Sequence, residues 1–135
     1  MLSAEDRLAI HELIALYGYI IDERQFSRTP EVFAERAVYD CSDFGIEVIV
    51  GCDAIVALWS GPDSRHPLAH HATNVVVTPL EANRAAVISK GIGVRPGGMT
   101  GSVTYTDVVE KQPQGWRIIE RKAVLRRPET IPQPS

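Results

Sequence analysis

The chain has 135 residues, of which 44% are hydrophobic and 23% charged, and its formal net charge is -3 at pH 7. These values are typical of one globular domain. The absence of a basic excess argues against a nucleic-acid partner, and no apolar run is long enough to span a membrane. With two cysteines and an acidic start, MLSAEDRL, that is unlike a signal peptide, we expect a cytoplasmic protein with reduced thiols.

The N-terminal segment carries the clearest helix signal. Ser3 followed by Asp6 resembles a capping box, and apolar side chains then recur at helical spacing. We therefore predict a helix over residues 4–23. We further predict that residues 1–126 form one domain and that residues 127–135, which are rich in proline, form a flexible tail.

Shorter elements follow the first helix. Thr29 and Pro30 predict the start of a second helix that ends near Glu35. Two strands are expected next, over residues 37–42 and 46–50. Asp53 is then expected to cap a short helix over residues 54–59 whose anchors include Trp59, with a loop at residues 60–67.

From residue 70 onward the pattern is strongly β, with breaks at segments of turn chemistry such as Pro96-Gly-Gly. Helices first and antiparallel hairpins afterwards predict an α+β fold. Gly91 and Gly93 share one face of their expected strand, which is typical of a bend or of close approach by another group. A sheet curved in this way around the long first helix would enclose a pocket. The alternative is that these glycines are only tolerated near loops.

His70 and His71 begin the β-rich segment. Period-two alternation places His71 with Thr73 on one face and His70 with Asn74 on the other. Either imidazole could be half buried and act as a general base, given a carboxylate that fixes its tautomer. The alternative is a structural histidine pair.

Asp22 is the best candidate for that carboxylate. It stands at the C-terminal end of an apolar helix, where an acid is unfavourable against the helix dipole. Gly18 lies on the same helix face and leaves space beside it. The competing interpretation is a solvated acid where the helix frays.

Tyr17 and Tyr19 could each offer a hydroxyl to a ligand, although packing is the commoner role of such residues. Tyr17 points about 140° away from Asp22 on an ideal helix, so both could meet one ligand only if the pocket wraps around the helix. Asp40 alternates with Tyr39 and Cys41 on the first strand, so the inward face could add either a carboxylate or a thiol to the pocket. We expect no metal, because His66, His70 and His71 lack a completing ligand and adjacent strand histidines point in opposite directions.

The segments Tyr17-Gly-Tyr-Ile-Ile-Asp22, His70-His71-Ala-Thr-Asn74 and Gly115-Trp-Arg-Ile118 resemble the SnoaL-like family of the nuclear-transport-factor-2-like superfamily. That resemblance implies a cone-shaped, curved antiparallel or mixed sheet wrapped around a long N-terminal helix, with two further short helices. It is most informative for the dehydratase-type members: scytalone dehydratase, hexachlorocyclohexane dehydrochlorinase and bile-acid dehydratase.

In these members an aspartate at the end of the first helix orients a histidine that removes a proton. The resemblance assigns those roles here to Asp22 and His71. Tyr17 resembles the tyrosine of the bile-acid enzyme, and we expect it as a third catalytic residue that donates a hydrogen bond to the developing enolate oxygen. It thus implies a cofactor-independent lyase of the dehydratase type, or an isomerase, acting on a small, hydrophobic, cyclic carbonyl or enol compound. Further candidates for contact with substrate are Tyr19, Asp40, Trp59, His70, Asn74 and Arg121.

Members of the same superfamily also serve as non-catalytic ligand binders and as structural subunits, so this alternative stays open. The chain lacks a second pocket histidine where one relative has it, because that strand reads Lys90-Gly-Ile-Gly-Val. Cys41 also replaces the polar group that some relatives carry on the first strand. By resemblance we expect a homo-oligomer, either a dimer or a trimer.

Overall fold

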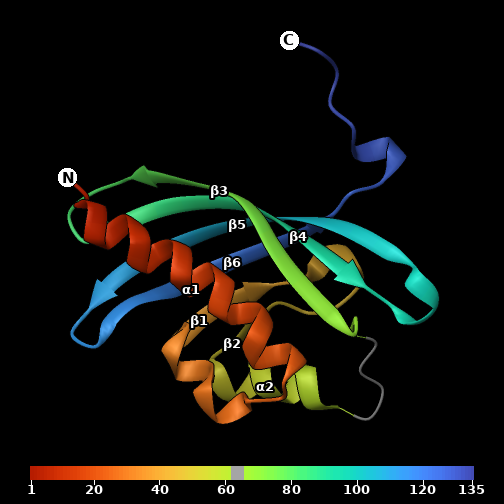
Figure 1. Ribbon diagram of the computed structural model, residues 1–135, viewed down its shortest axis with the longest axis horizontal. Helices are drawn as coiled ribbons and strands as arrows, with labels where there is room; N and C mark the ends of the chain where they lie inside the picture. The colour runs from red at the N-terminus through yellow and green to blue at the C-terminus, as the bar shows by residue number, and fades with distance from the viewer. Residues whose placement is uncertain (62–65) are drawn as a thin grey trace.

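The computed structural model describes residues 1–61 and 66–135; residues 62–65 of the expected loop at 60–67 lie outside the described part. A long helix, α1 (Ala4–Asp22), lies across one face of a curved six-stranded sheet (Figure 1). Ser3 and Asp6 form the predicted capping box. The buried side of α1 carries apolar residues at helical spacing, which explains why this face packs on the sheet.

The strands are β1 (Phe33–Asp40), β2 (Ile49–Val50), β3 (Ala69–Pro79), β4 (Arg84–Val94), β5 (Thr100–Gln112) and β6 (Gly115–Leu125). Their order in the sheet is β2-β1-β6-β5-β4-β3. Only the β1–β6 pair is parallel among the described pairs, so the sheet is mixed. The α+β prediction, with a curved mixed sheet around the first helix, is therefore confirmed, and the sheet is not closed.

The segment after α1 differs from the expected second helix. A 3-10 helix, η1 (Phe26–Glu31), occupies its start, and β1 begins at Phe33. Phe33 is 1% exposed and pairs with Ile118 of β6, so extension buries an aromatic side chain and completes a ladder. This tertiary pairing outweighs the local helix signal of Thr29 and Pro30.

The following elements are close to their expected positions. The strand expected over 46–50 is reduced to β2, and a short 3-10 turn, η2 (Ser42–Phe44), precedes it. Helix α2 (Cys52–Ser60) starts earlier than expected: Gly51, at φ 96°, occupies the cap position and Asp53 falls in the first turn. Two further 3-10 turns, η3 (Pro96–Gly98) and η4 (Pro128–Thr130), lie in the β4–β5 connection and in the C-terminal segment.

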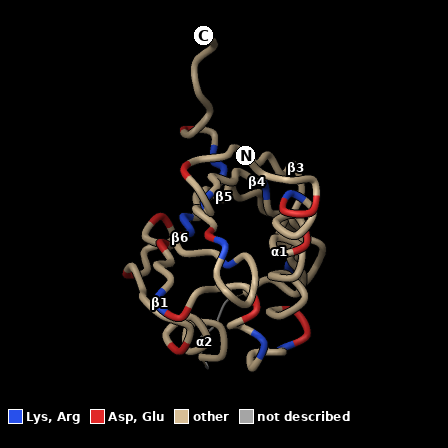
Figure 2. Tube along the Cα trace, turned by 90° about the vertical axis from the view of Figure 1, so that its left-hand side faces the viewer, with Lys and Arg blue, Asp and Glu red and all other residues tan. Residues whose placement is uncertain are grey.

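The exterior carries mixed charge. Lys and Arg are interspersed with Asp and Glu along the chain and do not gather on one side (Figure 2). No helix in the described part of the chain is long and apolar enough to cross a membrane.

The segment after β6 extends away from the body (Figure 1), and Arg127 at its start is held by an ion pair to Asp43 at 2.9 Å.

Candidate active site

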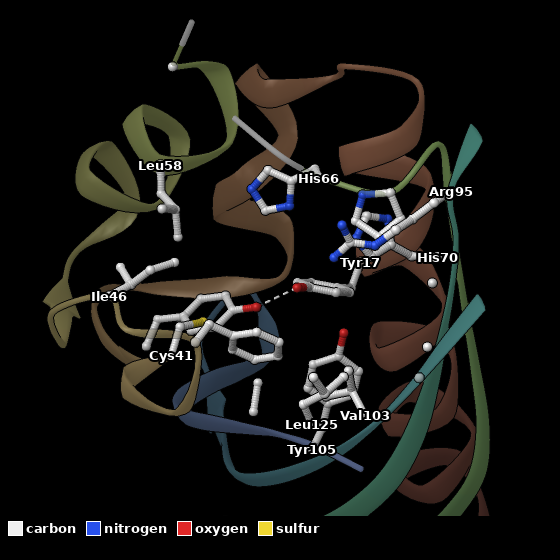
Figure 3. A pocket seen from close by; sticks show the side chains of 18 of the residues that line it. Tyr17, Cys41, Ile46, Leu58, His66, His70, Arg95, Val103, Tyr105 and Leu125 are labelled. Carbon is white, nitrogen blue, oxygen red and sulfur yellow. Dashed lines mark hydrogen bonds between the residues drawn. The ribbon is translucent and has the colours of Figure 1, made fainter. Parts of the chain in front are cut away.

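A cavity of about 710 Å³ opens between α1, α2 and the concave face of the sheet. This volume is typical of a site for a small organic molecule. Figure 3 shows the side chains that surround it, which come from elements far apart in the sequence. Its wall is mostly apolar; the polar and aromatic lining includes Tyr17, Tyr39, Cys41, His66, His70, Arg95 and Tyr105.

Asp22 meets His70 at the side of this cavity. The Asp22 Oδ1 atom lies 2.6 Å from His70 Nδ1, and the backbone N–H of His70 donates to Asp22 Oδ2 at 2.9 Å. Both side chains are largely covered, with 12% of the His70 and 16% of the Asp22 side chain exposed. A carboxylate accepts hydrogen bonds, so the neutral imidazole carries its proton on Nδ1 and its lone pair on Nε2.

His71 does not take this place, and the expected pairing of His71 with Asp22 is wrong. His71 is exposed, whereas His70 lines the cavity. Side chains alternate between the two faces of β3, and at this end of the strand the face that looks into the cavity carries His70 and Ala72. His71 therefore points to the outer face. A bulge at Asn74, whose φ is 56°, then switches the inner face to Val75 and Val77.

Gly18 explains how β3 comes so close to α1. A Cβ atom placed on Gly18 would lie 2.7 Å from the backbone carbonyl oxygen of His70, closer than real contacts allow. The expected space on this helix face is therefore real, and the backbone of His70 occupies it. The missing side chain lets the strand approach until the Asp22 carboxylate reaches both the ring and the backbone of His70.

Tyr17 belongs to a cluster of three phenols at the base of the cavity. Its hydroxyl lies 2.5 Å from the Tyr39 hydroxyl, and its ring centroid lies 5.7 Å from that of Tyr105. The ring centroids of Tyr17 and His70 are 6.3 Å apart. Tyr17 therefore faces the same cavity as the imidazole, although it points away from Asp22 on the helix. The imidazole of His70 contacts both side chains, because it is bonded to Asp22 and packs against the ring of Tyr17.

Burial keeps these phenols protonated. Loss of solvent is the main cause that raises the pKa of Tyr17 and Tyr39 well above 10, and it also raises the pKa of Tyr105. The hydrogen bond between Tyr17 and Tyr39 uses one hydroxyl proton of the cluster, so a further proton stays available for a ligand oxygen. Burial likewise raises the pKa of the Cys41 thiol to about 11, so this sulfur is not a ready nucleophile.

Arg121 lies behind the cluster and not on the cavity wall. It is 1% exposed and forms a two-pronged ion pair with Asp107, with both N···O distances at 2.8 Å. Its guanidinium carbon lies 4.3 Å from the ring centroid of Tyr17 and 4.0 Å from that of Tyr105. Burial lowers the pKa of Arg121, but the Asp107 carboxylate outweighs this and raises it above its usual value. The pair therefore fixes the two phenol rings from below.

The structure places the other expected contact residues outside the cavity wall. Tyr19 is 66% exposed on the opposite side of α1, and Asn74 is exposed at the bulge. Asp40 accepts hydrogen bonds from the backbone and hydroxyl of Ser42 at the end of β1. Trp59 is 2% exposed and packs on Tyr17 at a centroid distance of 5.8 Å, so it supports the cluster from behind.

Other cavity residues were not assigned to a pocket from the sequence. Tyr39, Tyr105 and Arg95 lie on β1, on β5 and just after β4, and nothing in the local pattern separates them from ordinary strand residues. His66 was considered only as a metal ligand; its ring lies 6.0 Å from that of His70, and burial lowers its pKa. Within residues 1–61 and 66–135, no three His, Cys, Asp or Glu side chains gather as a metal ion would require.

Gly91 and Gly93 form part of the cavity wall. A Cβ on Gly91 would lie 2.5 Å from the Tyr105 ring, and one on Gly93 would lie 2.7 Å from Pro67. The prediction that these glycines mark close approach of another group is therefore confirmed.

Comparison with known proteins agrees with this fold. An NTF2-like protein with a cystatin-like fold from Novosphingobium aromaticivorans superposes with a TM-score of 0.80 at 28% identity, covering 93% of this chain and 85% of that chain. A candidate aromatic ring hydroxylase from the same species gives 0.74 at 28% identity, over 95% and 94%. The hexachlorocyclohexane dehydrochlorinase LinA-type3 from Novosphingobium barchaimii gives 0.72 at 20% identity, over 93% and 92%, a likeness of fold alone.

Among curated proteins, no sequence matches the chain. The model of the SnoaL-like domain, in contrast, matches residues 2–122, which include α1, most of the cavity lining and almost all of the sheet. The chain therefore belongs to the SnoaL-like family.

Proposed function

We propose that the protein is a cofactor-independent lyase of the dehydratase type, or an isomerase, that acts on a small cyclic carbonyl or enol compound. The observation that carries this proposal is the 2.6 Å contact between Asp22 and the Nδ1 atom of a histidine that lines the cavity. A carboxylate on one ring nitrogen leaves the other nitrogen as a base toward a ligand. The dehydrochlorinase of the same fold, which by its name removes hydrogen chloride, is consistent with this class of reaction.

In the first step, His70 Nε2 takes a proton from the carbon beside the substrate carbonyl. The electron pair of the broken C–H bond moves into the carbonyl group, whose oxygen becomes an enolate oxygen. The phenol cluster donates its available proton in a hydrogen bond to that oxygen, and Asp22 stabilises the imidazolium that has formed. Tyr17 is the best-placed donor, because it is the member nearest to His70 by ring contact.

In the second step, the imidazolium returns the proton. If it protonates a hydroxyl on the β carbon, the enolate electron pair forms a C=C bond while the C–O bond breaks and water leaves. If the substrate instead carries a C=C bond between its β and γ carbons, the enolate is a dienolate, and protonation at the γ carbon moves the double bond into conjugation and gives an isomer. The apolar cavity strengthens each of these polar interactions because little bulk water competes with them.

A second candidate function is ligand binding without turnover. The observation that favours it is the bond from the His70 backbone N–H to Asp22, since this bond gives the carboxylate a purely structural role in fastening β3 to α1. Both functions use the same cavity. In the enzyme the imidazole of His70 transfers a proton, whereas in the binding protein it only packs against its neighbours.

The test is a turnover screen with cyclic β-hydroxy ketones, in which the conjugated enone product is followed by its ultraviolet absorbance. We expect His70→Ala to lower kcat at least about 100-fold, the usual contribution of a general base, and His71→Ala to remain near the native rate. His71→Ala is a matched control because the neighbouring histidine is exposed. Equal activity of the native protein and His70→Ala would refute the proposal, and absence of turnover across the panel would favour the binding module.

A further inference from the structure

The mouth of the cavity carries an arginine that the proposed reaction does not use. Arg95 directly follows β4, lines the cavity and is otherwise exposed. Figure 3 shows its side chain extending toward the middle of the pocket, beside His70 in this view. Within residues 1–61 and 66–135, its guanidinium forms no ion pair with a carboxylate.

The charges around the cavity are unequal at its two ends. At the base, Arg121 is neutralised by Asp107. Beside the wall, Asp22 carries a negative charge, but His70 covers it on the cavity side. Among the described lining residues none is an acid, so Arg95 contributes the permanent charge of the described wall.

We propose that the cavity binds an anionic organic molecule, with its ring body against the apolar wall and its carboxylate or sulfonate on Arg95 at the mouth. The guanidinium fork matches a carboxylate or sulfonate in shape and charge. This inference rests on the proposed function, because it assumes that the same cavity binds the substrate. It adds that the ligand is an anion.

A pair of fluorescent probes that differ by one sulfonate tests this inference. 8-Anilino-1-naphthalenesulfonate is the anionic member, and N-phenyl-1-naphthylamine is the same ring system without the charge. We expect the native protein to bind the sulfonate more tightly. Arg95→Gln should weaken sulfonate binding about five-fold, as for an exposed charge pair, and leave binding of the neutral probe within about two-fold.

Two controls define the site. Lys90→Gln removes one positive charge from the outer face of the same strand, so it should change neither affinity. Leu58→Trp fills the cavity from α2, so it should weaken both probes. An unchanged ratio of the two affinities in Arg95→Gln would overturn the inference. Failure of either probe to bind, or binding that Leu58→Trp does not reduce, would overturn it as well.

The same assay separates this inference from the proposed reaction. His70→Ala should keep the preference for the sulfonate because the probes need no proton transfer. A protein that shows the Arg95-dependent preference but no turnover would refute only the enzymatic proposal. Turnover of neutral ketones together with an unchanged probe ratio in Arg95→Gln would refute only the anion site.

Discussion

Replacing Gly18 with alanine sets two opposing effects against each other in one helix. Alanine is a better helix former than glycine by about 1 kcal/mol, so helix propensity alone predicts a more stable protein. The new methyl group, however, would lie 2.7 Å from the carbonyl oxygen of His70 and 3.6 Å from its Cβ atom. The obstacle is backbone, which cannot rotate aside as a flexible side chain can.

Relief of this contact requires α1 and β3 to separate by several tenths of an ångström. Overpacking of this kind typically costs about 1–3 kcal/mol, which equals or exceeds the propensity gain. We therefore expect Gly18→Ala to lower the free energy of unfolding by up to about 2 kcal/mol. The separation also lengthens the two contacts between Asp22 and His70. The activation free energy of turnover should therefore change by more than the free energy of unfolding does.

Urea denaturation measures the stability term, and an unchanged m-value shows that the denatured state is the same. Ala15→Gly, at an exposed position of the same helix, measures the propensity term separately and should cost about 1 kcal/mol. If Gly18→Ala instead stabilised the protein by about the amount that Ala15→Gly loses, the tight contact between helix and strand would be refuted.

Four further predictions concern the cavity and the contacts that hold the fold around it. Asp107→Ala leaves a buried guanidinium unpaired and should cost about 3–5 kcal/mol in thermal or urea unfolding, whereas the double change Asp107→Leu with Arg121→Met should recover most of that loss. Tyr17→Phe should lower kcat about 100-fold or more, with little change in KM, if its hydroxyl acts only on the developing enolate. Hydrogen bonds from Trp116 and from the Lys111 ammonium lower the pKa of Asp6 below 3.8. The ionised carboxylate therefore stabilises the folded protein fully above pH 3.8, and this contribution is lost as the pH falls further. Asp6→Asn should remove this part of the acid sensitivity, as measured by unfolding at a series of pH values. Asn74→Ala should cost about 1 kcal/mol because φ at this position is 56°, while Asn74→Gly should be nearly neutral; equal costs would contradict this assignment.

The order of elements could be predicted from the sequence because their signals are local. The Ser3–Asp6 box and the apolar stripe of α1 define a helix without reference to the rest of the chain. The start of β1 could not be predicted in this way. It depends on pairing with β6, which lies more than 80 residues further along the chain, and this pairing outweighs the helix signal of Thr29 and Pro30.

In the candidate site, too, one residue could be predicted from a local signal and another could not. Asp22 was predicted because an acid at the end of an apolar helix is locally unfavourable, and the structure gives it a partner. The choice between two adjacent histidines depends on how β3 is rotated relative to α1, and alternation alone cannot fix that rotation. The bulge at Asn74 further reverses the relation between the histidines and the buried valines, since His70 shares its inner face with Val75 and Val77.

The position of the imidazole proton tests the central claim most directly, and nitrogen-15 NMR of the histidine rings measures it. At a pH where the rings are neutral, we predict that His70 carries a proton on Nδ1 that exchanges slowly with water, and that Asp22→Asn abolishes this protection. The ring protons of His71 should exchange quickly in both proteins. A slowly exchanging proton on His71, with none on His70, would contradict the account.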